Sequence, residues 1–128
     1  MTMQVAFVVP DRELWSGEAT TVIAKTTEGD IGVLTGHAPV FGVLAEGSQV
    51  EILNDDAEPV RAAVSGGFLS VADNRVSILA ARAELSGEVD ADQAQRELDT
   101  ALADAEPGPE ESAEAMYARA QLRVAGRA

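Results

Sequence analysis

The 128-residue sequence contains no cysteine, few aromatic residues and no long apolar run. Without cysteine the protein has neither disulfide bonds nor thiolate chemistry, which agrees with a reducing compartment. Aromatic residues make up only 4% of the chain, so a core must rest on Val, Ile and Leu. The longest apolar runs, such as 76–81, are far too short to cross a bilayer. The first residues do not resemble a signal peptide, so we expect a cytosolic location.

Basic residues are also scarce, and their placement is uneven. The net charge of −13 argues against nucleic acid as a partner, because phosphates would repel such a surface. From residue 115 onward, however, the chain has Arg119, Arg123 and Arg127 and no acidic residue. This basic tip is a candidate docking element for an acidic partner. The alternative is that these cations only complement the dipole at the C-terminal end of a helix.

Up to about residue 84, short β-prone segments alternate with turn signals. The expected strands are 5–9, 20–25, 40–44, 50–53, 60–64, 68–71 and 76–80. Between two of them, Gly66 and Gly67 are expected to form a turn or bulge. Trp15 is expected to pack, partly buried, in a strand, and the alternative is that it anchors an interface. Strands of this length and spacing predict an all-β sandwich or flattened barrel.

The pattern changes to helical spacing near residue 89. Asp90 followed by Gln93 has the spacing of a capping box. The apolar positions expected on the first helix are Ala91, Ala94, Leu98, Ala101, Leu102 and Ala105. The prolines at 106–109 must end this helix, and a second one is expected from about 109 or 110 to 125, with Gly126 at C′. Its expected apolar face is Ala113, Met116, Tyr117, Ala120 and Val124.

The predicted fold is therefore α+β, with a sandwich domain at 1–86 and an antiparallel helical hairpin at 87–128. The hairpin seam is rich in alanine, which buries little area compared with leucine. Both helices also have high intrinsic propensity, so each could persist away from its dock. We therefore expect a hairpin that can leave the sandwich.

The segment 28–39 is dense in glycine, has the single histidine of the chain, His37, and ends at Pro39. So many glycines predict a loop shaped to meet a partner. His37 has no Ser-His-Asp context and is better explained as a contact residue than as a base. No catalytic residue, metal ligand or cofactor site is expected anywhere in the chain.

These residues, in this order, are similar to those of a known family. The motifs that carry the similarity are Val8-Val9-Pro10, Trp15-Ser16-Gly17-Glu18, 28–34 with Gly36-His37-Ala38-Pro39, 65–69, 74–76, 78–80 and 120–125. Along essentially its whole length, the chain resembles the epsilon subunit of the bacterial F-type ATP synthase. The resemblance implies a non-catalytic rotor subunit of the central stalk, which couples proton-driven rotation of the c-ring to ATP synthesis.

The resemblance also implies partners and site residues. The sandwich would bind the gamma subunit on one side and the c-ring through a loop that contains Glu28, Asp30, Ile31, His37 and Ala38. The protein would thus lie at the cytoplasmic face of the cell membrane, held there by the complex and not inserted itself.

The helical hairpin is a latch in many members of this family. Folded down on the sandwich it permits turnover, and extended along gamma it blocks ATP hydrolysis. The resemblance implies that Arg119, Arg123 and Arg127, expected on one helix face, contact the beta and alpha subunits. Charge reversal at Arg123 is then expected to raise ATP hydrolysis.

One departure from the family concerns nucleotide binding. Some bacterial members bind ATP through the pattern Ile/Leu-Asp-x-x-Arg-Ala, which corresponds here to 89–94. Gln93 replaces the arginine, and glutamine has no charged fork for a phosphate. Asp92 adds a negative charge beside it. Asp90 is left as a weak nucleotide contact at most, and its role as a helix cap is favoured.

Two alternatives come from other functional classes. An unrelated β-sandwich adaptor, whose helical tail binds an acidic protein, would explain the composition but not the ordered glycine motifs. A small enzyme or ligand-binding protein of sandwich fold would need a constellation of reactive residues that the sequence lacks.

Overall fold

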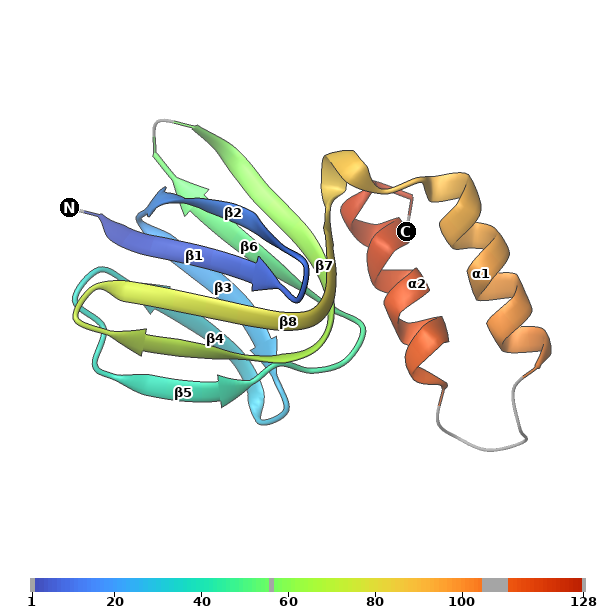
Figure 1. Ribbon diagram of the computed structural model, residues 1–128, viewed down its shortest axis with the longest axis horizontal. Helices are drawn as coiled ribbons and strands as arrows, with labels where there is room; N and C mark the ends of the chain where they lie inside the picture. Colours follow the sequence, from blue (N-terminus) through green and yellow to red (C-terminus); the bar gives the residue numbers. More distant parts are fainter. Residues whose placement is uncertain (1, 56, 105–110, 128) are drawn as a thin grey trace.

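A computed structural model describes residues 2–55, 57–104 and 111–127 (Figure 1). The strands are β1 Met3–Val9, β2 Arg12–Ala19, β3 Thr21–Thr26, β4 Gly29–Leu34, β5 Val40–Val43, β6 Ser48–Asn54, β7 Ala57–Ala72 and β8 Arg75–Leu85. They are followed by the 3-10 helix η1 Ser86–Glu88 and by the helices α1 Ala91–Ala103 and α2 Ala113–Val124. The expected sandwich followed by a helical hairpin is confirmed.

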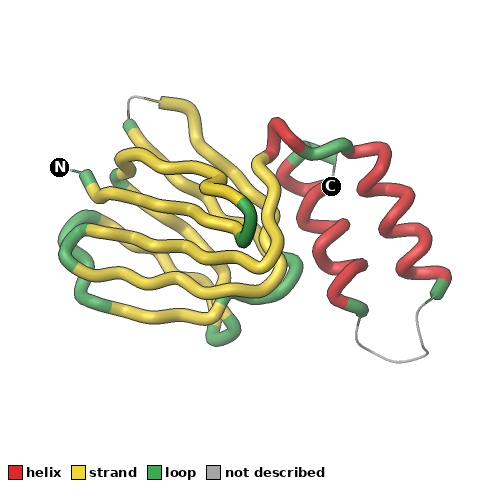
Figure 2. The backbone as a smooth tube through the Cα atoms, in the orientation of Figure 1, coloured by secondary structure: helices red, strands yellow, loops and turns green. Residues whose placement is uncertain are grey.

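The strands are hydrogen-bonded in the order β2-β1-β8-β7-β6-β3-β4, and β5 pairs separately with β7. Figure 2 shows the strands gathered in one body with the helices at one end of it. Only the pair β1–β8 is parallel among the described strands. The 16-residue strand β7 joins the two parts of the sandwich. Its first half pairs with β6 and its second half with β5.

The predicted turn or bulge at Gly66 and Gly67 is wrong, because both glycines lie inside β7. The register of β7 with β8 is the same on both sides, from Ser65 opposite Arg82 to Gly67 opposite Ala80. Both glycines have positive φ, 70° and 119°. A Cβ on Gly67 would lie 2.7 Å from the Cα of Ala80 and still closer to the Leu79 carbonyl. The glycines therefore bend a continuous strand where it changes partner.

Aliphatic side chains fill the core of the sandwich, as the scarcity of aromatic residues predicts. The residues with no exposed surface include Phe7, Val22, Val33, Val50, Val64, Leu69 and Ile78. Trp15 packs partly buried against this core, which confirms its prediction.

The helix α2 lies against the sandwich and α1 packs on α2 from outside (Figure 1). On one side, Tyr117, Ala120 and Val124 form a buried cluster with Ala63 of β7. The residues that pack α2 on α1 are Ala94, Leu98, Ala115, Ala118 and Leu122. With α2 between the sheet and α1, seven of its residues are buried, more than one apolar face requires.

Most of the predicted helix positions agree with this packing. Ala94, Leu98, Tyr117, Ala120 and Val124 are buried, and Ala91, Ala101, Ala113 and Met116 are partly buried. The prediction for Leu102 is wrong, since it is 44% exposed at the margin of the stripe that faces α2. Ala105, the break at 106–109 and the expected start of the second helix at 109 or 110 lie outside the described residues. Within them, α2 begins at Ala113 after the N-cap Ser112 and ends before Gly126, which has a φ of 84°.

Candidate interaction surfaces

The glycine-rich segment is not a single loop, because its residues 29–34 form the edge strand β4. This strand pairs with β3, so that Asp30 lies opposite Lys25. The turn before it is held by the Thr26 hydroxyl, which donates to the Gly29 carbonyl at 2.8 Å and accepts from the Glu28 amide at 3.2 Å. The expectation of a loop is therefore corrected to a β-hairpin, in which the positive φ of Gly29 allows the turn.

The second part of the segment follows the far end of β4. The His37 amide donates to the Leu34 carbonyl at 3.0 Å, and the Gly36 amide donates to Asn74 Oδ1 at 2.6 Å. The His37 ring Nδ1 lies 2.6 Å from the Ala38 carbonyl oxygen. The bond of Gly36 ties the segment to the turn between β7 and β8, and the other two are internal to the segment.

The five candidate residues of the segment are thus divided between two ends of one strand. Glu28, Asp30 and Ile31 are at its start, and His37 and Ala38 follow its end. At about 3.3 Å per residue the two ends are about 17 Å apart. A partner that contacts both groups must extend along the edge of the sheet.

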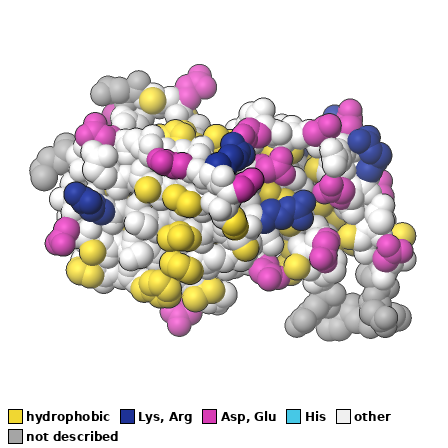
Figure 3. Space-filling model, in the orientation of Figure 1, with side chains coloured by type: hydrophobic (Ala, Val, Ile, Leu, Met, Phe, Trp, Pro, Cys, Tyr) yellow, Lys and Arg dark blue, Asp and Glu magenta, His cyan; other side chains and the backbone are white. Residues whose placement is uncertain are grey.

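An exposed apolar surface lies on β5, β7 and β8, and the sequence predictions did not include it. Its residues are Phe41, Val43, Phe68 and Leu79, which we call the apolar row. Cross-strand pairing places Val43 beside Phe68 and Phe68 beside Leu79, and the rings of Phe41 and Phe68 are 5.2 Å apart. Hydrophobic side chains gather on this face of the sandwich (Figure 3). A patch of this kind is typical of a protein–protein interface.

The sequence did contain a signal for the apolar row. Along β7, Leu69 and Val71 are buried, so strict alternation places Phe68 on the outer face. Phe68 and Leu69 are both apolar, so the sequence does not show by itself which of the two faces the solvent.

The three candidate arginines each have a partner within the chain. Arg119 pairs with Glu111 at 2.7 Å, and Arg127 pairs with Asp92 at 2.7 Å. Arg123 donates to the Gly47 carbonyl at 2.9 Å. The expectation of one helix face is wrong for Arg127, because α2 ends at Val124. Arg119 and Arg123 remain neighbours on the helix.

The two ion pairs shift the pKa values of the side chains that form them. The hydrogen bond and the charge of Arg127 lower the pKa of Asp92, and the hydrogen bond of Arg119 lowers the pKa of Glu111. Glu111 in turn raises the pKa of Arg119. Arg119 and Arg127 are therefore each paired with a carboxylate, whereas Arg123 is bonded to a neutral carbonyl and keeps its net charge.

The cap at the start of α1 forms as predicted. The Asp90 carboxylate accepts from the Gln93 amide at 3.1 Å. The Gln93 side chain does not close the box on Asp90 and donates instead to Glu97 Oε1 at 3.1 Å. Both residues that correspond to the nucleotide pattern are thus engaged in α1 itself.

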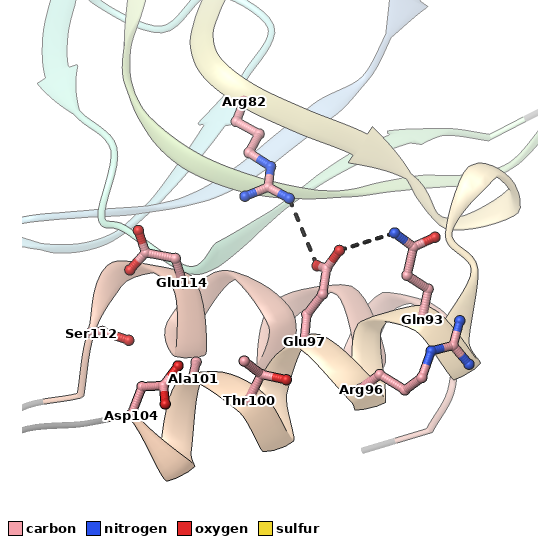
Figure 4. A pocket seen from close by; sticks show the side chains of 9 residues that line it. All are labelled: Arg82, Gln93, Arg96, Glu97, Thr100, Ala101, Asp104, Ser112 and Glu114. Carbon is pink, nitrogen blue, oxygen red and sulfur yellow. Dashed lines mark hydrogen bonds and ion pairs between the residues drawn. The ribbon is translucent and has the colours of Figure 1, made fainter.

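A hollow of about 840 Å³ lies between the helices below Arg82 (Figure 4). Three carboxylates line it, those of Glu97, Asp104 and Glu114, against the two guanidinium groups of Arg82 and Arg96. Arg82 is also 3.8 Å from Glu97. This balance of charge disfavours a phosphate chain.

Polar groups join α2 to β8 above the buried cluster. The Arg82 guanidinium lies 4.2 Å from the centre of the Tyr117 ring, and the Tyr117 hydroxyl donates to Glu84 Oε1 at 3.3 Å. The Gln121 side-chain amide donates to the same oxygen. Burial, with the charge of Glu84, raises the pKa of Tyr117 far above its ordinary value, so the phenol stays neutral.

Within the described ranges, no three His, Cys, Asp or Glu side chains are grouped as metal ligands would be. None of the described helices is long and apolar enough to span a membrane.

Comparison with known proteins gives consistent matches. The family described as ATP synthase, Delta/Epsilon chain, beta-sandwich domain matches residues 2–86. The ATP synthase epsilon chain of Streptomyces avermitilis is 52% identical over 112 residues, which cover 88% of this chain and 90% of that one. The epsilon chain of Thermobifida fusca is 49% identical over 123 residues, which cover 94% and 90%.

Two solved structures share the fold at low sequence identity. A chain of the Euglena gracilis mitochondrial ATP synthase (OSCP/F1/c-ring) has a TM-score of 0.72 and 23% identity, with 98% of this chain and 78% of that one covered. A chain of the Tetrahymena thermophila mitochondrial ATP synthase (central stalk/c-ring) has a TM-score of 0.60 and 19% identity, with 99% and 92% covered.

Proposed function

Because the chain belongs to the family of ATP synthase epsilon chains, we propose different functions for its two parts. As a member of this family, the chain is a non-catalytic subunit of the central stalk of the F-type ATP synthase. The sandwich, residues 1–86, holds the subunit on the rotor. The helical hairpin, residues 87–128, restrains ATP hydrolysis. The observation that carries this proposal is the small contact between the hairpin and the sandwich, most of which is made by α2.

The sandwich has two surfaces suited to partners. The apolar row is the proposed contact with the gamma subunit, since its aromatic side chains are exposed and pre-ordered on a rigid sheet. The two ends of β4, with Glu28, Asp30 and Ile31 at one and His37 and Ala38 at the other, are the proposed contact with the c-ring. Through these contacts the subunit transmits rotation, and it lies at the cytoplasmic face of the membrane without entering it.

The hairpin acts through the arginines of its second helix. While α2 is docked, Arg123 and Arg127 are held by Gly47 and Asp92. When α2 leaves the sandwich, Arg123 loses its bond to Gly47. Arg127 loses Asp92 once α2 also separates from α1, and both cations can then bind acidic segments of the beta and alpha subunits. Arg119 keeps Glu111, which lies next to α2 in the chain, and contributes less.

The test compares ATP hydrolysis by the assembled complex with the full chain and with a chain that ends at Gly87. The truncated chain keeps both sandwich surfaces, so we expect it to assemble into the complex. We expect that complex to hydrolyse ATP faster than the complex with the full chain. Equal rates with full occupancy of the complex would refute the inhibitory role and leave the family assignment intact.

A further inference from the structure

The turn between β5 and β6 meets α2 at closer range than any side chain would allow. We propose that this turn is the seat of α2, and that the docked hairpin depends on residue 47 having no side chain. The proposal rests on the proposed function only for its effect on ATP hydrolysis. Docking itself is a property of the isolated chain.

Gly47 has a φ of 62° and lies against Met116 of α2. A Cβ on residue 47 would overlap the Cβ and the carbonyl carbon of Met116 and would lie 2.6 Å from its carbonyl oxygen. Two of these atoms belong to the helix backbone, which cannot rotate away. A side chain at residue 47 must therefore displace α2 as a whole.

The same turn binds α2 at a second point. Arg123 donates to the Gly47 carbonyl at 2.9 Å, and it lies about two helical turns from Met116 on the same side of α2. The turn itself is firmly held: the buried Ser48 hydroxyl donates to the Ala45 carbonyl at 2.7 Å, and the Ala45 amide donates to the Lys25 carbonyl at 2.9 Å. Because this turn is rigid, steric overlap at residue 47 is relieved by movement of α2 and not of the turn.

The other contacts between α2 and the sandwich are short-range and would be disturbed by such a displacement. They include the hydrogen bonds of Tyr117 and Gln121 to Glu84 and a buried cluster. The buried cluster under α2 consists of Ala63, Tyr117, Ala120 and Val124, and its two alanines make contact only at short range. The helix α1 adds a pair between exposed side chains, Arg82 and Glu97 at 3.8 Å. Contact at Gly47 thus decides whether the cluster can close.

The experiment uses the full chain with Gly47→Ala or Gly47→Asn. Asparagine tolerates positive φ, so it separates the effect of a Cβ from backbone strain. We expect both variants to lower the hydrogen-exchange protection of α2 amides by about 10- to 100-fold, the range for overpacking a close contact. The sandwich strands should keep their protection. In parallel, spin labels at Glu58→Cys and Glu114→Cys, in a chain with no native cysteine, should report a longer and broader distance.

The matched control is Gly36→Ala. Gly36 also has a positive φ, 84°, but a Cβ there would meet nothing within 4 Å. We expect this variant to lower protection in α2 no more than in the strands. Wild-type protection of α2 in both Gly47 variants overturns the proposal. A loss in Gly47→Ala but not in Gly47→Asn also overturns it, because strain and not the Cβ would then be the cause.

A second variant covers the case in which the Gly47 variants do not fold. Arg123→Met keeps the side-chain stem and removes the hydrogen bond to the seat. We expect α2 protection to fall by about 2- to 10-fold, as for loss of one hydrogen bond. Unchanged protection overturns the proposal.

The effect on the assembled complex separates this proposal from the proposed function. Gly47→Ala releases α2 with its arginines intact, so ATP hydrolysis should decrease. If Gly47→Ala releases α2 but ATP hydrolysis is unchanged, the proposal for residue 47 holds and the inhibitory role is refuted. If α2 remains docked in this variant, only the proposal for residue 47 is refuted.

Discussion

Asp92 Oδ1 and Arg127 Nη2 lie 2.7 Å apart, so the first turn of α1 is tied to the chain beyond the end of α2. Arg127 lowers the pKa of Asp92 from its ordinary value of 3.8. A carboxylate with a lowered pKa stabilises the fold above its unfolded pKa, and the contribution is lost as the pH falls through its folded pKa. The ion pair thus closes this end of the hairpin at neutral pH and opens it in acid.

We therefore expect the protection factors of the amides at the end of α2 to fall below a pH of about 4, and Asp92→Asn to remove that dependence. High salt should have a similar effect at neutral pH, because both side chains are exposed. Hydrogen exchange followed by NMR measures both. Equal pH dependence in wild type and Asp92→Asn would assign the transition to other carboxylates.

Charge reversal at Arg123 should raise ATP hydrolysis by the assembled complex. Arg123→Glu loses its bond to Gly47 and releases α2, but the released helix lacks the cation that would hold it on an acidic segment. Steady-state ATPase rates give the result, with Gly47→Ala as the contrasting variant. An unchanged rate would exclude Arg123 from the inhibitory contact.

Removal of an aromatic side chain from the apolar row should weaken binding to gamma. We expect Phe41→Ser to reduce affinity by about 30-fold, which corresponds to about 2 kcal/mol for a central interface residue. The fold should persist, because Phe41 is 63% exposed. Calorimetry with purified gamma measures the affinity. Leu102→Ser on α1 is the matched control, and an equal loss in both would point to general destabilisation.

Two substitutions at Tyr117 separate its hydroxyl from its ring. Tyr117→Phe loses the hydrogen bond to Glu84 and should cost about 1 kcal/mol of the free energy of unfolding. Tyr117→Ala also empties the space below Arg82 and should cost about 3–5 kcal/mol. Urea unfolding measures both values. Equal costs would mean that the ring contributes nothing beyond its hydroxyl.

The hairpin should exchange faster than the sandwich in the wild-type chain. Among the described residues, the apolar contact of the hairpin with the sheet is a cluster of four buried residues, whereas the core of the sandwich has twenty. Local opening of α2 therefore needs less free energy than global unfolding. Native-state hydrogen exchange compares the two, and equal protection of α2 and β7 would contradict a labile hairpin.

Local signals predicted much of the fold correctly. The turn residues and β-branched runs located most strands, and Asp90 marked the start of α1 because a cap depends only on its own helix. The family motifs led to the right family. Family membership excludes the unrelated adaptor and the small enzyme that composition alone left open.

Errors arose where a residue serves a distant segment. The glycines of β4 predict a loop. At 12–19 only the expected packing of Trp15 indicates a strand, and no bounds are predicted because polar residues interrupt the apolar pattern. Gly67 faces Leu79 and Gly47 faces Met116, and neither neighbour can be inferred from local sequence. A glycine in the sequence indicates that the backbone can adopt a positive φ, but it does not indicate which distant segment packs against it.

The bend in β7 has a mechanical consequence. Ala63 lies under α2 and Phe68 belongs to the apolar row, so one continuous strand joins the helix contact to the partner face. At the bend itself, the Gly67 carbonyl accepts from the Leu44 amide at 2.9 Å, which ties it to the turn that bears Gly47. On the proposed contact of the apolar row with gamma, a force applied to one half of β7 would therefore reach the helix seat through the backbone, with the two glycines as the flexible point.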